Sequence, residues 1–171
     1  MLYVNSPILA RHERKDFMDR QRLGAEIIGL TQTLYRISRG LLRCEADRED
    51  AVQSAVEKAW SKAEKLRDER RLKPWLVRIL INECYSLLRK KRRETAMASL
   101  PDGEALMEDD DARALRDALD ALPADLRMPI LLHYMEGLSV SEIASALRCP
   151  KGTVLSRMSR GRKQMRMFLE S

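Results

Sequence analysis

The stretch LSVSEIASALRCPKGTVLSRMSR, residues 138–160, decides the fold of the second half of this chain. Ser139 and Glu142 stand three residues apart at the start of an apolar run, which is the spacing of a capping box at a helix N-terminus. Residues 148–152 then interrupt the apolar pattern, as a tight turn would. The small side chain of Ala144 would let two helices cross closely, so the stretch predicts a helix-turn-helix.

The second helix of this pair has an apolar side and a polar, basic side. Val154 and Met158 are spaced to pack back on the first helix, and Thr153 is expected to cap the second helix at its N-terminus. A plain helical hairpin would also fit the apolar pattern. The small residue, turn, cap and basic face together favour a helix that enters the major groove of DNA. The residues predicted to contact DNA are Lys151, Thr153, Leu155, Ser156, Arg157, Arg160 and Lys163.

Composition extends the helical prediction to the whole chain of 171 residues. Hydrophobic residues make up 44%, charged residues 34% and aromatic residues only 5%. So few aromatic residues argue against a β-sandwich or barrel, and the hydrophobic content argues against wholesale disorder. We therefore expect an all-α protein.

The sequence also bounds the compartment. No apolar run approaches the roughly 20 residues that a membrane-spanning helix needs, and the N-terminal residues lack the pattern of a secretion signal. The cysteines, Cys44, Cys84 and Cys149, are too far apart for a disulfide framework or a zinc pattern. These observations predict a cytoplasmic protein.

Charge divides the chain into parts. Residues 94–125 carry 2 basic and 10 acidic side chains, net −8, whereas the segments on both sides are basic. Basic segments suggest a polyanionic partner, because Lys and Arg that neutralise phosphates release counterions, although they also fit solvated helix faces. The Pro101-Asp102-Gly103 turn signal lies within the acidic part. We predict two small helical domains, residues 1–94 and 112–171, joined by a flexible acidic linker, residues 95–111.

Helical periodicity also dominates the first domain. An apolar stripe from Ile27 to Leu41 predicts one helix. A second is predicted from Ala51 to Trp60, with Asp47 at the N-cap position. The charged stretch from Lys62 to Lys73 has weak periodicity and is expected to be a loop with a short helix.

A helix from Pro74 to Arg93 is predicted to carry a nucleic-acid-binding face. Arginine binds phosphates, asparagine pairs with base edges and tyrosine stacks on unpaired bases. The alternative is a solvated helix whose C-terminal cations suit the helix dipole. The residues that recur at steps of three and four on this face are Arg78, Asn82, Tyr85 and Arg89.

Taken in order, these segments resemble bacterial RNA polymerase sigma factors of the extracytoplasmic-function (ECF) group of the sigma-70 family. The resemblance covers about residues 20–168, and it rests on two sets of motifs in the right order on either side of a linker. The first set is ADREDAVQ (46–53), Trp60, PWLVRILIN (74–82) and LLRKKRR (87–93). The second set is LP (122–123), GLS (137–139), EIA (142–144) and GTVLSR (152–157).

The resemblance implies an initiation factor that binds core RNA polymerase, recognises the minus-thirty-five and minus-ten promoter elements and promotes promoter opening. The second domain would read the minus-thirty-five duplex, and the acidic linker would follow a polymerase channel otherwise used by RNA. Docking on the polymerase clamp coiled coil is implied for Asp47, Asp50, Gln53 and Glu57. Capture of the minus-ten element is implied for Arg67, Arg70, Arg71, Lys73, Arg78, Asn82, Tyr85 and Arg89.

The resemblance also implies three partners: core RNA polymerase, through its clamp coiled coil and flap, promoter DNA and an anti-sigma factor. The anti-sigma factor would offer a way to hold the chain near the membrane. No cofactor, no metal and no enzymatic activity are expected, because the sequence has only two histidines, His12 and His133, and no Gly-rich phosphate loop. A stand-alone helix-turn-helix regulator and an RNA-binding helical protein are the rival interpretations.

Three positions depart from the family pattern. Arg148 occupies a turn position where family members commonly have glycine, and a left-handed backbone there costs a residue with a side chain about 1 kcal/mol or more. Ser86 stands where aspartate is usual, and the loop at residues 66–72 lacks a frequent aromatic residue. The last two departures bear on the preferred minus-ten sequence.

Overall fold

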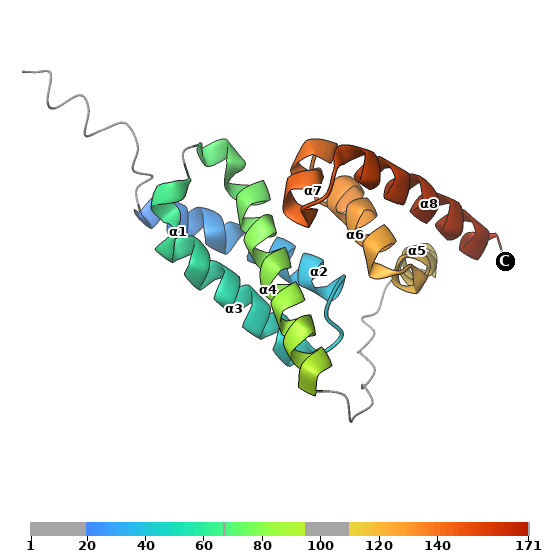
Figure 1. Cartoon of the computed structure of the whole chain (residues 1–171), viewed down its shortest axis with the longest axis horizontal. Coiled ribbons are helices and arrows are strands. Elements are labelled where there is room, and N and C mark those ends of the chain that lie inside the picture. Colours follow the sequence, from blue (N-terminus) through green and yellow to red (C-terminus); the bar gives the residue numbers. More distant parts are fainter. Residues whose placement is uncertain (1–19, 67, 95–109, 171) are drawn as a thin grey trace, which may run out of the picture.

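The computed structural model describes residues 20–66, 68–94 and 110–170, and within these ranges the regular secondary structure is entirely helical. Figure 1 shows two groups of helices that pack side by side, one from each half of the chain. We call them the N-terminal group (α1–α4) and the C-terminal group (α5–α8). The predicted acidic linker at residues 95–111 lies outside the described residues except for its last two positions, which begin α5.

The N-terminal group is built on the pairing of α3 with α4 (Figure 1). Ala51, Ala55 and Ala59 form a stripe of small, fully buried side chains on α3, and this stripe lets α4 approach closely. The helices are α1 (Arg20–Gly29), α2 (Thr31–Arg39), α3 (Glu45–Ser61) and α4 (Leu72–Glu94), with 3₁₀ turns η2 (Ala63–Lys65) and η3 (Glu69–Arg71) before α4.

The C-terminal group wraps short helices around the long α8. Gly161 marks the crossing of α8 and α6, because a Cβ atom there would lie 2.5 Å from Ile130 Cδ1. The helices are α5 (Asp110–Ala121), α6 (Ala124–Ile130), α7 (Val140–Leu147) and α8 (Lys151–Leu169). A π-helical turn, η4 (Leu131–Met135), continues α6.

The predicted helix-turn-helix is confirmed in α7 and α8. Ser139 Oγ accepts a hydrogen bond from the Glu142 amide at 3.3 Å, and Glu142 Oε2 accepts one from the Ser139 amide at 2.8 Å, which completes the capping box. Ile143 and Val154 are fully buried where the two helices pack. Arg148 ends α7 at φ +52° and ψ +46°, so the left-handed turn expected from the sequence is present.

The two groups share one large hydrophobic cluster, and a second, smaller cluster of Leu122, Leu126 and Ile130 lies within the C-terminal group. Buried side chains of both groups belong to one cluster, and α4 packs against α7. The groups also lie close together at Gly40, because a Cβ atom there would lie 3.1 Å from both Leu131 Cδ1 and Met128 Sδ of the C-terminal group. The structure is therefore a closed arrangement of the two groups.

Three details of the predicted elements are wrong. The stripe from Ile27 to Leu41 spans two helices, because the chain breaks at Leu30 while α1 and α2 bury the same side. Cys44, not Asp47, is the N-cap of α3, since Cys44 has the extended backbone (ψ 133°) and Asp47 lies inside the first turn. Pro150 likewise takes the N-cap of α8 that was expected of Thr153.

Candidate nucleic-acid interface

The outer face of α8 is open to solvent over most of its length. Lys151, Ser156, Arg160 and Lys163 are exposed, and Leu155 leaves 55% of its surface accessible. An exposed leucine amid polar and basic side chains suits contact with a thymine methyl group. Five of the seven residues predicted for the minus-thirty-five element thus share an accessible surface.

The remaining two residues are half-buried where α8 begins. Thr153 lies in the first turn of the helix. Arg157 Nε lies 3.8 Å from Asp125 Oδ2, and its side chain is 28% exposed. Because Asp125 is itself half-exposed, this ion pair contributes little stability and leaves the guanidinium available to another partner.

The face of α4 predicted to capture the minus-ten element is only partly open. Arg78 and Arg89 are exposed, while Asn82 is half-buried and donates a hydrogen bond from Nδ2 to the Arg78 carbonyl oxygen at 2.7 Å. Tyr85 is half-buried: burial raises the pKa of its hydroxyl, the Arg157 charge lowers it and Asp125 raises it. The C-terminal group lies beside this face, because α4 contacts α7 and Tyr85 packs against the hydrophobic cluster that both groups share.

The predicted minus-ten residues in and after the loop before α4 are likewise only partly accessible. Arg70 and Arg71 are exposed. Asp68 caps η3 by accepting hydrogen bonds from the Arg70 amide at 3.1 Å and from Arg70 Nε at 3.2 Å, and these bonds lower the pKa of its carboxyl group. Lys73 instead points to Glu136 of the C-terminal group. Arg67 lies outside the described residues.

The residues predicted to dock on polymerase lie along α3. Asp50, Gln53 and Glu57 are exposed, and Gln53 Nε2 donates a hydrogen bond to Glu57 Oε1 at 3.0 Å. Asp47 differs, because its side chain is 14% exposed and its Oδ2 lies 2.6 Å from Lys91 Nζ of α4. This ion pair joins α3 to α4.

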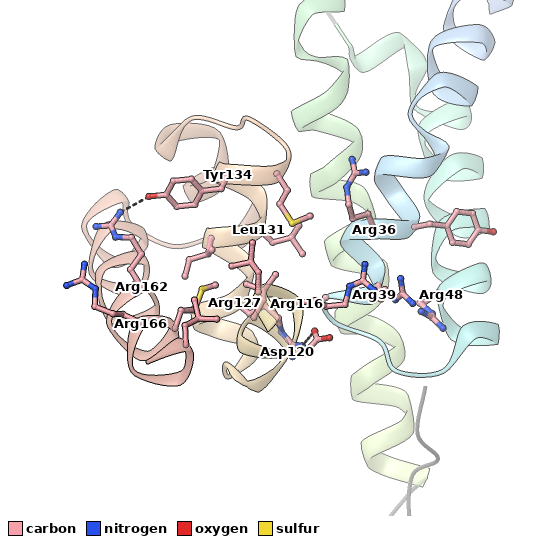
Figure 2. Close-up of a pocket in the computed structure, with 18 of the residues that line it drawn as sticks. Arg36, Arg39, Arg48, Arg116, Asp120, Arg127, Leu131, Tyr134, Arg162 and Arg166 are labelled. Atoms are coloured by element: carbon pink, nitrogen blue, oxygen red, sulfur yellow. Dashed lines mark hydrogen bonds and ion pairs between the residues drawn. The ribbon is translucent and has the colours of Figure 1, made fainter. Parts of the chain in front are cut away.

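An arginine-rich groove between the two groups was not predicted from the sequence. It has a volume of about 1580 Å³ and opens between α2 and the helices α5, α6 and α8 (Figure 2). Its apolar floor includes Leu119, Ile130 and Met165, and the groove forms only when the two groups pack together, so no local motif could reveal it. The arginines among its described lining residues are Arg36, Arg39, Arg48, Arg116, Arg127, Arg162 and Arg166.

His133 and Cys84, whose side chains are common in catalytic sites, have structural surroundings here. His133 Nδ1 lies 2.9 Å from the Leu138 carbonyl oxygen, which ties η4 to the segment before α7. Burial raises the pKa of the Cys84 thiol to about 12. Within the described ranges no cluster of His, Cys, Asp and Glu could hold a metal ion, and no helix there is long and apolar enough to cross a membrane.

Comparison with known proteins agrees with this architecture. Two family models match: "Sigma-70 region 2" over residues 30–94 and "Sigma-70, region 4" over residues 112–165. The ECF RNA polymerase sigma factor SigM of Mycobacterium tuberculosis (strain ATCC 25618 / H37Rv) is 30% identical, covering 93% of this chain and 87% of SigM. RNA polymerase sigma factor SigV of Bacillus subtilis (strain 168) is 31% identical, covering 81% of this chain and 85% of SigV.

The same relation holds in three dimensions. The sigma factor RpoE from Bartonella quintana, solved in complex with the anti-sigma factor NepR, aligns with a TM-score of 0.76 and 31% identity, covering 86% of this chain and 96% of RpoE. The fold and its two matched regions define a protein of the sigma-70 class. Within that class, the chain belongs to the ECF RNA polymerase sigma factors. It is thus an alternative sigma factor of transcription initiation, a class of DNA-binding factors rather than enzymes.

Proposed function

We propose that this chain binds core RNA polymerase and directs it to promoters by reading two DNA elements with two separate faces. The observation that carries the proposal is the presence of two basic faces in a chain that belongs to the ECF family: the one on α4 also bears an amide and an aromatic ring, and the one on α8 also bears hydroxyl groups and a leucine. Phosphate contacts by Lys and Arg would supply affinity, and the uncharged side chains would supply base preference.

The proposed reader of the minus-thirty-five duplex is the N-terminal half of α8. A helix with an accessible outer face is rigid enough to enter the major groove, where each base pair presents a distinct pattern of donors and acceptors. Arg157 and Arg160 are the proposed arginine contacts, and Leu155 is the proposed apolar one. The capping box of α7 supports the reader by fixing the helix on which α8 packs.

The proposed minus-ten site is α4 with the loop before it. Opening a duplex requires unstacking bases, which costs a few kcal/mol that protein contacts must offset. Tyr85 offers a ring for stacking and Asn82 an amide for a base edge. Arg70, Arg71 and Arg78 would hold the separated strand by its phosphates.

The exposed acidic and amide side chains of α3 are the proposed docking surface for the polymerase clamp. We propose that residues 1–94 and 112–171 act as separate domains on the polymerase, with the acidic segment between them following a channel shaped for RNA. Acidic side chains are suited to such a path because they carry the charge that RNA phosphates carry. Core polymerase is a cytoplasmic enzyme, so we propose that the chain works in the cytoplasm.

Transcription in vitro tests the function directly. Purified core polymerase would transcribe a genomic fragment library with and without the chain, and the RNA 5′ ends would be sequenced. The expected result is a set of start sites that appear only with the chain and share two upstream motifs. An absence of new start sites, with tight binding to duplex DNA by the chain alone, would instead favour a stand-alone regulator.

A second experiment isolates the minus-ten site. We expect Asn82→Ala to reduce permanganate reactivity of the opened strand at least severalfold while leaving core binding unchanged, because the side chain lies on α4 and away from the docking face of α3. Leu88→Ala, a change of another exposed side chain of α4 that is not among the predicted minus-ten residues, serves as the matched control. Normal strand opening in Asn82→Ala would remove this residue from the site.

We further propose that an anti-sigma factor binds the arginine-rich groove through an acidic amphipathic helix. Seven arginines face three acidic residues among the described lining residues, and the floor is apolar, so the groove complements such a helix in charge and in surface. The groove also touches both helix groups, so its occupant would hold both DNA-binding faces at once. Titration with a synthetic Leu/Glu amphipathic helix tests this. Arg166→Glu should weaken binding, and Lys90→Glu on α4 should not.

A further inference from the structure

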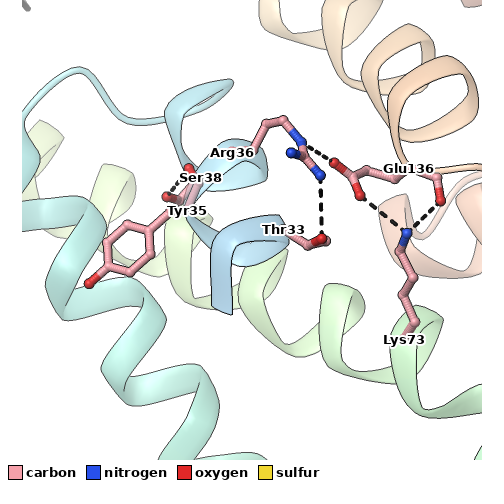
Figure 3. Close-up of polar contacts among 6 residues, drawn as sticks. All are labelled: Thr33, Tyr35, Arg36, Ser38, Lys73 and Glu136. Carbon is pink, nitrogen blue, oxygen red and sulfur yellow. Dashed lines mark hydrogen bonds and ion pairs between the residues drawn. The ribbon is translucent and has the colours of Figure 1, made fainter. Parts of the chain in front are cut away.

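A buried carboxylate joins the two helix groups. The Glu136 side chain is fully buried, and it lies between one cation from α2 and one from α4 (Figure 3). Arg36 Nε donates a hydrogen bond to Glu136 Oε1 at 2.6 Å. Lys73 Nζ lies 3.2 Å from Oε2 and donates a hydrogen bond to the Glu136 carbonyl oxygen at 2.7 Å. Glu136 belongs to the C-terminal group and both cations to the N-terminal group.

The backbone is shaped to deliver Glu136 to this point. The helix that starts as α6 widens into the π-helical turn η4, and the Glu136 amide donates to the carbonyl oxygen of Leu131, five residues earlier. Gly137 follows with φ +69°, which turns the chain sharply toward α7. π-helical turns of this kind concentrate at functional positions.

The Glu136 ion pairs hold the groups together, but one carboxylate oxygen lacks a hydrogen bond. A buried carboxylate is costly unless it is paired and hydrogen-bonded. Both cations come from the other group, so Glu136 is compensated only while the groups are closed. Yet Oε2 accepts no hydrogen bond among the described residues, although it is ion-paired with Lys73. Water would satisfy that oxygen in an open molecule, which keeps opening accessible.

Closure competes with the minus-ten site. Lys73 is directed at Glu136 and not at DNA. Tyr85 is half-buried and packs against the hydrophobic cluster that both groups share, and α4 contacts α7. The face of α4 that would receive an unstacked base therefore lies against the C-terminal group.

Closure also conflicts with the distance between promoter elements. Elements centred near positions minus ten and minus thirty-five are about 25 base pairs apart, or about 85 Å of B-DNA at 3.4 Å per pair. In the closed arrangement α4 contacts α7, and α7 packs directly against α8. The two readers cannot reach both elements without separating.

We propose that Glu136, with Arg36 and Lys73, is an autoinhibitory clasp that keeps the two DNA-binding faces together until the sigma factor opens. This inference rests on the proposed function for its consequence, but closure itself is measured without polymerase or promoter. Release of the clasp frees Lys73 and uncovers Tyr85. Any event that pulls the C-terminal group away would therefore add the α4 face to the α8 face, whose outer side is already exposed in the closed arrangement.

The first test uses small-angle X-ray scattering of the full chain. The wild-type profile should match the closed arrangement. Glu136→Gln removes the charge at nearly constant shape, and Arg36→Met removes the cation, so each should raise the radius of gyration. Gly40→Leu is an independent wedge, because its side chain would collide with Leu131 and Met128. Glu83→Gln is the matched control, since it breaks an ion pair with Lys58 inside the N-terminal group.

The second test measures DNA affinity of the same variants without polymerase. Apparent affinity scales with the fraction of molecules in the competent state, so opened variants should bind a pool of 60-base-pair random duplexes about fivefold or more tightly than wild type. An extended wild-type profile, or folded clasp variants with wild-type size and affinity, would overturn the clasp. Transcription by an open variant tests the proposed function separately, since its failure would leave the change in size intact.

Discussion

Arg148 is a residue held in a backbone conformation that suits glycine. Its φ of +52° places it in the left-handed region, where a side chain costs about 1–2 kcal/mol. The side chain is exposed, so nothing buried compensates. We expect Arg148→Gly to raise the free energy of unfolding by about 1 kcal/mol in urea titrations. Gln164→Gly, on the exposed side of α8 with an ordinary helical backbone, should lower it by a similar amount. If Arg148→Gly lowered the free energy of unfolding, the claim that the backbone at Arg148 is strained would be wrong.

Cys84 differs from the other two cysteines in its surroundings. It is fully buried, and burial raises its pKa to about 12, whereas Cys44 and Cys149 are partly exposed. The thiolate is the reactive form, so a raised pKa leaves Cys84 protonated and inert at neutral pH. Mass spectrometry after brief iodoacetamide treatment at pH 8 should find Cys44 and Cys149 modified and Cys84 unmodified. In guanidinium all three should react, and rapid native labelling of Cys84 would contradict its burial.

Arg157 is the residue whose contribution to promoter affinity is most directly testable. If it reads a base, Arg157→Ala should weaken binding to the minus-thirty-five duplex by about 1–3 kcal/mol and relax preference at one position. Its weak pairing with Asp125 means that little folding stability is lost with it. Ser159→Ala, an exposed neighbour on α8, is the control. Equal affinities of the two variants in fluorescence anisotropy would remove Arg157 from the contact set.

At the scale of the element, the capping box makes the stability of α7 depend on pH. Hydrogen bonds from Ser139 lower the pKa of Glu142 below its ordinary value. Because the folded pKa is the lower one, the stabilisation is fully present above the unfolded pKa and is lost as the pH falls through the folded pKa. Ser139→Ala should therefore cost about 1 kcal/mol at pH 7 and less near pH 3. Thermal unfolding of wild type and variant across that range measures it, and a difference that does not shrink in acid would contradict the role of Glu142.

Elements with local signals could be predicted from the sequence. The capping box, the turn at Arg148 and the amphipathic stripe of α4 each depend on residues within a few positions of one another, and all three are present. N-caps were harder, because Cys44 and Pro150 cap α3 and α8 through backbone conformation alone and without a side-chain hydrogen bond. The clasp at Glu136 depends on contacts between residues 63 and 100 positions apart, and the arginine-rich groove is lined by residues of both helix groups, so hydrophobic periodicity could not predict either one.

At the scale of the whole molecule, the proposed polymerase docking surface and the contact between the two helix groups lie on different sides of the N-terminal group. In Figure 1, α4 lies between α3 and the helices α7 and α8, and the exposed Asp50, Gln53 and Glu57 lie on α3. A closed molecule could therefore dock on the polymerase first and open afterwards. That order would deliver the two DNA-binding faces only where a promoter can use both.

This order predicts that docking and closure can be separated by mutation. A polymerase surface that binds acidic side chains would repel a lysine in place of Asp50. Asp50→Lys should therefore weaken core polymerase affinity about tenfold or more. Its scattering profile should stay that of the closed wild type, because Asp50 takes no part in the contact between the groups. Glu49→Lys, an equally exposed charge reversal on another side of α3, is the matched control and should retain core affinity. Conversely, Glu136→Gln should open the molecule while core affinity stays within about twofold, well under 1 kcal/mol. If opening raised core affinity as strongly as it raised DNA affinity, polymerase itself would select the open form, and docking would have to follow the release of the clasp.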